Sequence, residues 1–547
     1  MEGVAGAIPF SFSLFSNCTE GLYKGHFALS FAKIYFEMKK RALVFTLSSI
    51  LFLQTATKAQ QPDFIKKDIE SYIKNGMKDW NVPGLAIVIV KDGKVVLRKG
   101  FGVNDITKSE PVDENTLFYI ASNSKLFTGT ALAHLQFHKK LSLNDKITKF
   151  YPDYRLYDSL TTLQVSIRDM LTHRIGTKTF QGDFTFWNTT LTRSQIMEKM
   201  RLLKPIGIYR QDYGYCNSCF LTAGEVIPKV TSGISWEQYV TDSIVKPLGM
   251  NQTHVSSNGL RSKVTNMAIP YTTSFTGKLN RVPDDNWDNL GPAASIVSNV
   301  KDLTNWLLMQ LDSGRIDGKR VLPWQVLQAT RDVQIMTGSR KSTVYPMHFR
   351  GYGLGLNIAD YNARQVYWHT GGAAGMVSNV CFIPEENLGI AILTNNDNQN
   401  FFEALRYQVM DAYLGVPFVN RSEFMLKPFN SGEKEALDSI ASWRTQAGQK
   451  DPTEGFDAYA GNYTNELYGR ISIQRKGAKQ LEIKFEHHPE LFGYLTSMGG
   501  TEWLLEFNNI EYGIFKVKFS NLPNGGKTFE LKVNDFVEYD TYLFTKK

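Results

Sequence analysis

The sequence predicts an α+β fold: an antiparallel β-sheet flanked by helices, with a mostly helical insertion, followed by a small C-terminal all-β domain. Three observations predict it. Two β-rich runs around a Lys-Asp-Gly turn, "PGLAIVIVKDGKVVLRKGFGV", indicate a hairpin at 83–103. Helical and polar segments dominate from about 122 to 335, and strand patterns return after them. From about 452 the alternation of apolar and polar residues becomes strong, which indicates a separate β domain.

The elements of the larger domain follow in order along the chain. A helix is expected within 62–80, where apolar side chains recur with helical spacing. After the hairpin and the helical insertion, "YWHTGGAAG", "MVSNVCFIP" and "LGIAILTN" have the composition of three successive strands. We expect these strands and the hairpin to share one antiparallel sheet, with the insertion packed beside it.

Changes in composition suggest where the domains end. Residues 60–418 are expected to form the larger domain, and the polar segment 419–451 is expected to be a linker with some helical character. In 452–547, runs such as "LEIKFE" and "FKVKF" alternate apolar with polar residues, and "NLPNGGK" has the composition of a turn. We therefore expect this last part to be a β-sandwich or barrel.

The N-terminal region carries a processing pattern. Met38 is followed by the basic stretch 39–41 and the apolar run "ALVFTLSSILFLQ". The pattern is typical of a secretory signal peptide over 38–59, cleaved near Ala59, with residues 1–37 as an upstream extension. A membrane anchor is the alternative, but the apolar run is short for a span. We expect a secreted or periplasmic protein of bacterial type, without a transmembrane span after cleavage.

Composition argues against several classes of function. The formal net charge of +8 over 547 residues is mild and the basic residues are scattered, so nucleic acid is not an expected partner. Cys216 and Cys219 form a C-x-x-C pattern without a thioredoxin-like context or a second pair of zinc ligands, so we interpret them as structural. The adjacent His487 and His488 also lack partner ligands. We therefore expect neither a metal nor a cofactor.

The stretch "YIASNSKLFTG", residues 119–129, contains a serine–lysine pair. Residues three apart share one face of a helix, so Lys125 reaches Ser122 rather than Ser124. Free N–H groups at a helix start favour developing negative charge, and a buried amine of lowered pKa accepts a hydroxyl proton. The motif alone is weak evidence, because Ser-x-x-Lys occurs six times in the chain.

Two later motifs single out Ser122. Tyr215-x-Asn217 stands at the start of an apolar, helix-like run, and His-Thr-Gly at 369–371 lies in a predicted strand. Serine–lysine penicilloyl enzymes carry Ser-x-x-Lys, Tyr/Ser-x-Asn and Lys/His-Thr-Gly in this order. Only one combination of motifs in the chain has both this order and a sensible placement on helix start, insertion and sheet strand.

In these motifs the chain resembles the serine β-lactamase and penicillin-binding-protein superfamily, in the class C-like branch that includes DD-peptidases, D-aminopeptidases and esterases. "VSIRDMLTHRIGT", "GPAASIVSNVKDLTNWL" and "CFIPEENLGIAILTN" are also similar to segments of that family, and the resemblance covers roughly residues 64–418. It implies a β-lactamase/transpeptidase-like fold and an acyl-enzyme mechanism on a small-molecule or peptide substrate. The C-terminal β domain is similar to small β modules appended to such enzymes.

The resemblance implies roles for the residues of the first two motifs. Ser122 would attack a carbonyl and form an acyl-enzyme. Lys125 and Tyr215 would share the proton transfers, and which of them is the principal base stays open. Asn217 would hydrogen-bond to Lys125 and to the substrate amide.

The third motif would complete the site. His369 would support Tyr215 or bind the carboxylate end of the substrate, assisted by Thr370. The backbone N–H groups of Ser122 and Gly372 would form the oxyanion hole, where the loss of one donor typically costs about 2.7–4 kcal/mol of barrier. Gly371 and Gly372 would let the strand approach the substrate closely.

One departure from the family pattern bears on the substrate. His369 stands where class C β-lactamases usually have lysine, which disfavours efficient antibiotic hydrolysis. Our leading hypothesis is an exported serine hydrolase of small amides or esters, with D-amino-acid peptides or cell-wall fragments first among them. The alternatives are a carboxylesterase or weak β-lactamase of the same fold, and a penicillin-binding sensor without turnover. The sequence leaves the oligomeric state open.

Overall fold

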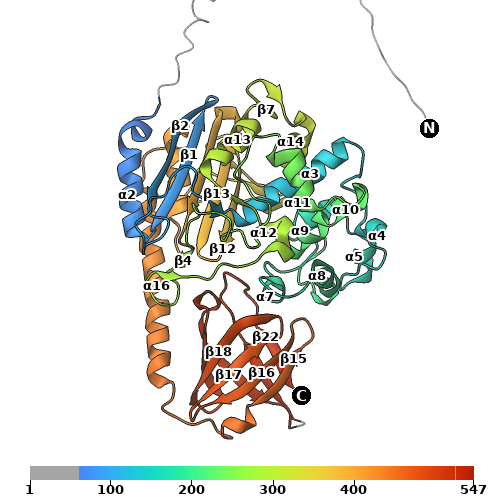
Figure 1. Cartoon of the computed structure of the whole chain (residues 1–547), viewed down its shortest axis with the longest axis vertical. Helices are drawn as coiled ribbons and strands as arrows, with labels where there is room; N and C mark the ends of the chain where they lie inside the picture. The colour runs from blue at the N-terminus through green and yellow to red at the C-terminus, as the bar shows by residue number, and fades with distance from the viewer. Residues whose placement is uncertain (1–60, 524) are drawn as a thin grey trace, which may run out of the picture. The chain divides into compact units, whose positions relative to one another are not determined.

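An eight-stranded antiparallel sheet runs through the larger part of the computed structural model, which describes residues 61–523 and 525–547. In order across the sheet, the strands are β2 (Lys94–Gly102), β1 (Gly84–Lys91), β14 (Leu388–Thr394), β13 (Met376–Ile383), β12 (Arg364–Ala373), β11 (Asn357–Tyr361), β10 (Arg350–Tyr352) and β9 (Ile335–Gly338). The predicted signal peptide and upstream extension lie outside the described residues. The α+β prediction is confirmed, because the early hairpin and the late strands share one sheet (Figure 1).

The hairpin of β1 and β2 turns at Asp92 and Gly93, which have φ angles of 52° and 72°. A two-residue turn with positive φ at both positions matches the twist of the flanking strands, and Asp-Gly adopts it readily. On its other edge β1 pairs with β14, with Leu85 opposite Thr394. Segments about 300 residues apart in the sequence are therefore paired as neighbouring strands, one strand in from the β2 edge of the sheet.

The two faces of the sheet bury separate layers of helices. One set of alternate β1 side chains packs with α2 (Ile69–Asp79) and α15 (Phe401–Leu414). The other set packs with α3 (Ser124–Phe137) and α13 (Val300–Leu311) on the opposite face (Figure 1). Successive side chains of a strand point to opposite faces, so a strand covered on both sides is apolar throughout, as "LAIVIV" is.

The insertion between β2 and β9 is mostly helical, as the sequence indicated, and besides α3 and α13 it consists of short elements. The remaining helices are α4 (Ile147–Phe150), α5 (Ser159–Gln164), α6 (Ile167–Leu171), α7 (Asp183–Phe186), α8 (Arg193–Lys199), α9 (Asn217–Gly224), α10 (Val226–Val230), α11 (Trp236–Val240), α12 (Gly291–Ala294) and α14 (Trp324–Arg331). The short strand pairs are β3 (Phe118–Tyr119) with β6 (Val297–Ser298), β4 (Tyr271–Thr272) with β5 (Asn280–Arg281), and β7 (Arg315–Ile316) with β8 (Lys319–Arg320). Within 61–523 and 525–547, no helix is both long and apolar enough to cross a membrane.

A long helix, α16 (Arg421–Gln446), occupies most of the segment for which the sequence indicated a linker. Asn420 caps it, because its side chain accepts the backbone N–H of Glu423. Most of its surface is exposed, so it lacks the wide apolar stripe by which a helix is usually recognised in a sequence. Ser422 accepts the Trp80 indole N–H at one end, and Ile440 packs against the barrel toward the other.

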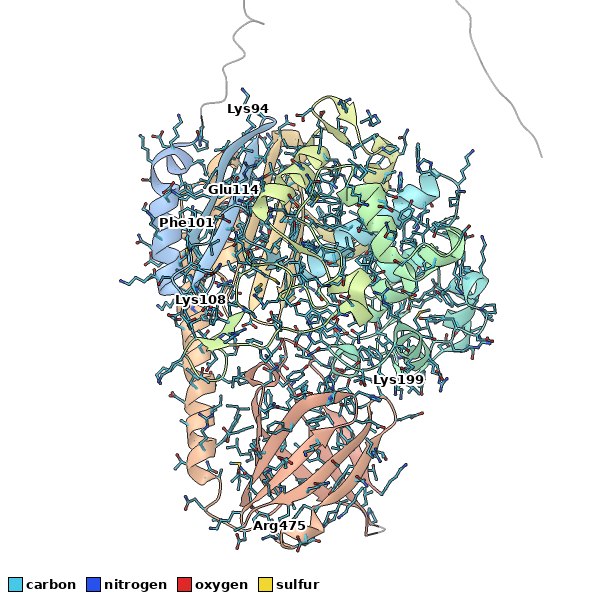
Figure 2. The ribbon with its side chains drawn as sticks, viewed as in Figure 1. Lys94, Phe101, Lys108, Glu114, Lys199 and Arg475 are labelled. Carbon is cyan, nitrogen blue, oxygen red and sulfur yellow. The ribbon has the colours of Figure 1, made fainter. Side chains whose placement is uncertain are left out.

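The C-terminal part is a closed antiparallel barrel, one of the two forms that the sequence predicted. Its strands are β15 (Gly461–Asn465), β16 (Gly469–Lys476), β17 (Gln480–Phe485), β18 (His488–Gly499), β19 (Glu502–Phe507), β20 (Ile514–Asn521), β21 (Lys527–Leu531) and β22 (Tyr542–Lys546). Pairing of β15 with β22 closes it, so no edge strand is left unpaired. The insertion contacts the barrel directly, because Lys199 Nζ donates a hydrogen bond to the Leu467 carbonyl (2.7 Å). Figure 2 shows Lys199 at the end of the barrel that faces the insertion and Arg475 at the other end.

Candidate active site

Ser122 lies in a single 3-10 turn, η2 (Ala121–Asn123), immediately before α3. Ala121 has a φ of 47°, a left-handed conformation that costs about 1–3 kcal/mol and is concentrated at functional sites. Ala121 and Asn123 are buried, whereas Ser122 is partly exposed. The turn therefore presents one hydroxyl group from an otherwise buried segment.

The neighbouring Ser124 has a structural contact instead. It is fully buried, and its Oγ accepts the backbone N–H of Ile296 at 3.0 Å. Ser122 Oγ lies 3.0 Å from Lys125 Nζ, as the helical spacing predicted. Of the two serines in "SNSK", only Ser122 faces the lysine.

Lys125 is 0% exposed and makes three polar contacts. Besides Ser122, Nζ lies 2.7 Å from Asn217 Oδ1 and 3.0 Å from the Ala293 carbonyl oxygen. Burial lowers the pKa of Lys125 to about 7, against the opposing effect of Asp183. A neutral amine has two N–H donors and one lone pair. Asn217 and Ala293 accept both donors, so the lone pair is left for the hydroxyl proton of Ser122.

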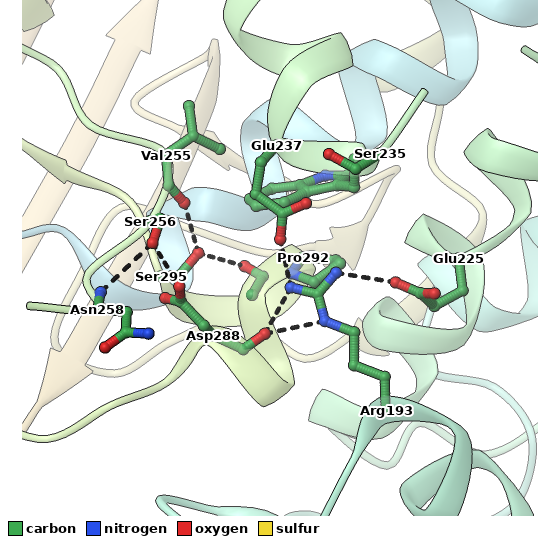
Figure 3. A network of polar contacts seen from close by, with 12 residues as sticks. Arg193, Glu225, Ser235, Glu237, Val255, Ser256, Asn258, Asp288, Pro292 and Ser295 are labelled. Atoms are coloured by element: carbon green, nitrogen blue, oxygen red, sulfur yellow. Dashed lines mark hydrogen bonds and ion pairs between the residues drawn. The ribbon is translucent and has the colours of Figure 1, made fainter. Parts of the chain in front are cut away.

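A network of polar contacts around Arg193 lies against the start of α12, the helix that carries Ala293 (Figure 3). Arg193 donates through Nη1 to Glu225 (2.9 Å) and through Nε to the Asp288 carbonyl (2.9 Å), and it also pairs with Glu237. Asp288 begins the 3-10 turn η5 (Asp288–Leu290), which leads directly into α12. The planar, multidentate guanidinium thus ties three segments of the insertion together beside the Lys125 contact.

Asn217 is held from its other side by an aspartate. It is the first residue of α9, and its Nδ2 donates to Asp183 Oδ2 at 2.6 Å. Asp183 begins α7, is 2% exposed, and has a pKa raised well above its ordinary value by burial. Asp183, Asn217, Lys125 and Ser122 form one continuous hydrogen-bonded chain.

Tyr215 lies over the lysine. The Lys125 Nζ is 4.7 Å from the centroid of the Tyr215 ring. Burial raises the pKa of Tyr215 well above its ordinary value, against a hydrogen bond with Ser122 that lowers it. The phenol is therefore protonated at neutral pH and acts as a donor in this state, whereas Lys125 is the group whose pKa suits a base.

His369 belongs to a chain of hydrogen bonds with a definite direction. His173 Nδ1 accepts the Cys216 N–H (3.0 Å), so its Nε2 carries the proton toward Tyr352 (3.3 Å). The Tyr352 hydroxyl then donates to His369 Nε2 (3.0 Å), and His369 Nδ1 donates to the Thr370 carbonyl (2.7 Å). The chain fixes the orientation of both imidazoles.

The charge state of His369 follows from this environment. Burial, together with the charge of Lys125, lowers the pKa of His369 to about 3. The ring is neutral at physiological pH, so it offers no positive charge to a carboxylate. The geometry thus favours a supporting role for His369 over carboxylate binding; its ring centroid lies 6.1 Å from that of Tyr215.

The rest of the third motif brings β12 against the serine turn. Thr370 Oγ1 accepts the Asn379 Nδ2–H at 2.9 Å. A Cβ on Gly371 would lie 2.0 Å from the Ile120 carbonyl oxygen, so only glycine allows the strand to approach this closely. Gly372 lies beside the pocket and close to the barrel, because a Cβ there would meet the ring of Phe536 at 2.7 Å.

These residues open into a pocket of about 560 Å³, a volume suited to a small ligand. The predicted site residues that line it are Ser122, Tyr215, Asn217, His369, Thr370 and Gly372. A barrel segment, the loop 532–541 between β21 and β22, also lines it, through Asp535, Phe536, Val537 and Tyr539. The pocket wall is therefore built from both parts of the chain.

Within the histidine pair of the barrel, the ring of His488 has two hydrogen-bond partners. His488 is buried, with Nδ1 2.8 Å from the Tyr468 hydroxyl and Nε2 3.0 Å from the Trp187 carbonyl oxygen. In the part of the chain that the structure describes, no group of three or more His, Cys, Asp or Glu side chains is arranged to hold a metal ion.

Sequence reasoning did not identify Asp183, Tyr352 or Phe536 as parts of the site. Asp183 follows a glycine at the start of a short helix, a weak local signal. Tyr352 stands in "GYGLGLN", which resembles a structural glycine-rich segment. Phe536 lies more than 160 residues beyond the third motif, so only the folded chain reveals its place.

The chain is similar in sequence and in fold to several known proteins. The family model described as Beta-lactamase matches residues 69–414. Protein flp from Staphylococcus aureus strain MRSA252 is 27% identical over 339 residues, which cover 61% of this chain and 64% of that protein. The chain thus spans somewhat less than two thirds of the length of this relative.

Two further similarities extend over more of the chain. Unguisins hydrolase ungD' from Aspergillus campestris is 25% identical over 432 residues, 75% of this chain and 78% of that protein. The octameric penicillin-binding protein homologue from Pyrococcus abyssi matches in structure with a TM-score of 0.55 and 20% identity. That match covers 87% of this chain and 99% of the homologue, and at this identity it shows a shared fold.

Proposed function

Because the chain belongs to the beta-lactamase family, we propose that it is a serine hydrolase that forms an acyl-enzyme at Ser122. The observation that carries this proposal is the buried Lys125, whose amine lies 3.0 Å from Ser122 Oγ. A relative named as a hydrolase supports the same class of activity. Small amides and esters are the substrates that such chemistry accepts.

The proposed reaction uses the chain of contacts around Lys125. The neutral amine takes the proton of Ser122 as Oγ attacks the substrate carbonyl, and the lysine ammonium then returns that proton to the leaving amine or alcohol. Breaking the bond to the leaving group gives the acyl-enzyme. Lys125, neutral again, takes a proton from the attacking water, and Ser122 is released with its proton restored.

The remaining residues support this sequence of steps. The backbone N–H groups of Ser122 and Gly372 would bind the oxyanion, for which removal of one donor typically costs about 2.7–4 kcal/mol. Tyr215, protonated in the free enzyme, would donate a hydrogen bond toward the leaving group. Asn217 would hold Lys125 and contact the substrate amide, and His369 would fix the wall of the pocket.

The charge of the pocket narrows the proposed substrates. Among the described residues that line it there is no arginine or lysine, and His369 is neutral. Asp397 and Asp535 lie on its wall instead. Substrates bound through a carboxylate, such as β-lactams or peptides ending in D-alanyl-D-alanine, thus lack an ionic partner. We place D-amino-acid amides, esters and peptide fragments that do not depend on a carboxylate first.

We also propose that the enzyme acts outside the cytoplasm, because residues 38–59 have the pattern of a signal peptide. Edman sequencing of the protein secreted by an expressing bacterium tests this step. We expect the secreted protein to begin near Gln60. A protein that stays in the cell and still carries residues 38–59 would contradict this proposal.

Labelling tests the acyl-enzyme directly. The purified protein is incubated with a fluorescent fluorophosphonate and with a fluorescent penicillin, beside Ser122→Ala and Ser431→Ala. Ser431 lies in another Ser-x-x-Lys pattern and is exposed on α16, which makes it a matched control. We expect fluorophosphonate labelling of the wild type and of Ser431→Ala, and none of Ser122→Ala. Absence of Ser122-dependent labelling by either probe would overturn the proposal.

Turnover separates the alternatives. We expect hydrolysis of D-alanine p-nitroanilide and of short acyl esters to exceed hydrolysis of nitrocefin and of D-alanyl-D-alanine peptides. A stable penicilloyl adduct without turnover of any amide or ester would instead support a sensor. Fast nitrocefin hydrolysis would contradict the substrate preference drawn from the pocket charge.

A further inference from the structure

The four-residue helix α7 contacts both the serine site and the barrel. Its first residue, Asp183, accepts the Asn217 amide at 2.6 Å, and Asn217 in turn contacts Lys125. The next residue, Phe184, is 0% exposed and belongs to the core cluster of the barrel. Asp183 therefore contacts the serine site, whereas the next side chain, Phe184, packs into the barrel.

Phe184 fills an aromatic socket of the barrel. Its ring stacks on Tyr468 at 5.1 Å with an interplanar angle of 13°, and on His488 at 4.9 Å and 11°. Tyr512 and Tyr542 meet it edge-on. Such pairs add about 0.5–1.5 kcal/mol each beyond area burial, so α7 is held firmly by the barrel.

One carboxyl group of the barrel accepts hydrogen bonds from the backbone on both sides of Asp183. Glu538, in loop 532–541, accepts the N–H of Gly182 through Oε1 and the N–H of Phe184 through Oε2, both at 2.9 Å. Its Oε2 also accepts the Tyr542 hydroxyl at 2.6 Å. Glu538 is 2% exposed, and burial raises its pKa to about 7, against the hydrogen bonds from Tyr542, Gly182 and Phe184 that stabilise its charged form.

The same loop supports the tyrosine side of the site. The Tyr539 ring lies 5.3 Å from Phe180, and Phe180 meets Tyr215 edge-on at 5.5 Å. Asp540, in the same loop, also forms an ion pair with Lys178, which lies two residues before Phe180 in the sequence. Both arms of the proton-transfer network, through Asn217 and through Tyr215, therefore rest on one barrel loop.

We propose that Glu538 is a positioning residue for the Ser122 site: by fixing the backbone of 182–184 it holds Asp183 on Asn217, and so holds Asn217 on Lys125. The barrel is then an integral part of the active site rather than an appended module. The inference rests on the proposed acylation of Ser122, and Glu538 itself does not touch the reacting atoms.

The test measures acylation kinetics with a fluorophosphonate in full-length wild type, Glu538→Gln, Glu538→Ala and Glu482→Ala. Glu482 is a barrel glutamate, 9% exposed, whose contacts are Lys476 and Lys484 on its own sheet, so it is a matched control. Rate constants are fitted against probe concentration and normalised to the folded fraction found by active-site titration and thermal unfolding.

We expect Glu538→Ala to lower the maximal rate constant of acylation by about 10- to 100-fold, because a shift of about 1 Å in a reacting group can cost ~10²-fold. Glu538→Gln keeps the volume and one acceptor, so a smaller fall is expected. The probe concentration for half-maximal rate stays unchanged, and Glu482→Ala acylates like the wild type.

Three results overturn the inference while leaving the proposed function intact. These are wild-type acylation rates in both Glu538 variants, a loss explained wholly by a smaller folded fraction, and an equal loss in Glu482→Ala. Failure of the wild type itself to react would instead overturn the proposed function, so the two failures are distinguishable. If Glu538→Ala does not fold, Glu538→Gln alone decides.

Discussion

Two helical Ser-x-x-Lys patterns in this chain have the same spacing and opposite surroundings. At the start of α3, Lys125 is 0% exposed and contacts Ser122, Asn217 and Ala293. On α16, the Lys434 side chain is 76% exposed and pairs with Asp438 one turn further along. The motif therefore supplies the geometry, whereas burial and polar partners supply the reactivity.

Among the residues that support Ser122, replacing Lys125 should slow acylation most, whereas replacing Lys434 is the matched control. Lys125→Met keeps an unbranched buried side chain but removes the base, so the acylation rate should fall by about 10²- to 10⁴-fold. Lys434→Met removes an exposed ion pair and should leave the rate unchanged. Second-order rate constants for fluorophosphonate labelling measure both. Wild-type reactivity of Lys125→Met would contradict Lys125 as the base.

The Tyr-x-Asn pattern allows a second comparison of the same kind. Asn217→Ala removes the contact that holds Lys125 in place, and we expect acylation to fall by about 10- to 100-fold. The same pattern recurs at Tyr463 in the barrel, where Asn465 accepts the N–H groups of Leu467 and Tyr468.

Asn465→Ala is therefore the control. It should lower the thermal unfolding temperature, because a turn loses its hydrogen bonds, but leave the acylation rate of the folded protein unchanged. Equal kinetic losses in the two variants would mean that Asn217 acts only through stability.

The pH dependence of acylation reports on the protonation state of Lys125. Lys125 has a pKa lowered to about 7 by burial, and only its neutral form takes the serine proton. Acylation should therefore rise with pH through a midpoint near 7, with about a tenfold increase between pH 6 and pH 8. Stopped-flow labelling across pH 5–9 measures it. A flat profile, or a rate that falls as pH rises over this range, would contradict Lys125 as the base.

Much of the fold followed from the sequence because its signals are local. The Asp92-Gly93 turn, the continuous apolar run of β1 and the alternation in the barrel strands each reflect short-range backbone and burial rules. The long helix α16 was the exception. Its residues are mostly exposed, so hydrophobic periodicity gave little sign of it.

The candidate site also combines residues found from local motifs with residues that only long-range contacts reveal. The order of the three motifs identified the residues that the structure gathers around Ser122, because each motif is contiguous in the sequence. Asp183, Tyr352 and Glu538 act through contacts with residues 17 to 356 positions away, which no local pattern encodes. The role of the barrel in the pocket could not be predicted for this reason.

The smallest expected effect concerns the other serine of "SNSK". Ser124→Ala leaves the buried N–H of Ile296 without its acceptor, which should lower the free energy of unfolding by about 1–3 kcal/mol. Acylation of the folded protein should persist, because Ser124 faces away from Lys125. Ser71→Ala, on the exposed surface of α2, should change stability by less than about 0.5 kcal/mol.

Denaturant unfolding and fluorophosphonate labelling of these two variants distinguish a structural role of Ser124 from a catalytic one. Loss of labelling in folded Ser124→Ala would mean that the two serines share the chemistry, contrary to the contacts that separate them. A stability loss without a kinetic loss would place Ser124 in the framework that holds the turn. Ile296 follows α12, the helix whose Ala293 carbonyl contacts Lys125. By accepting the Ile296 N–H, Ser124 would therefore help to hold α12 in place against Lys125.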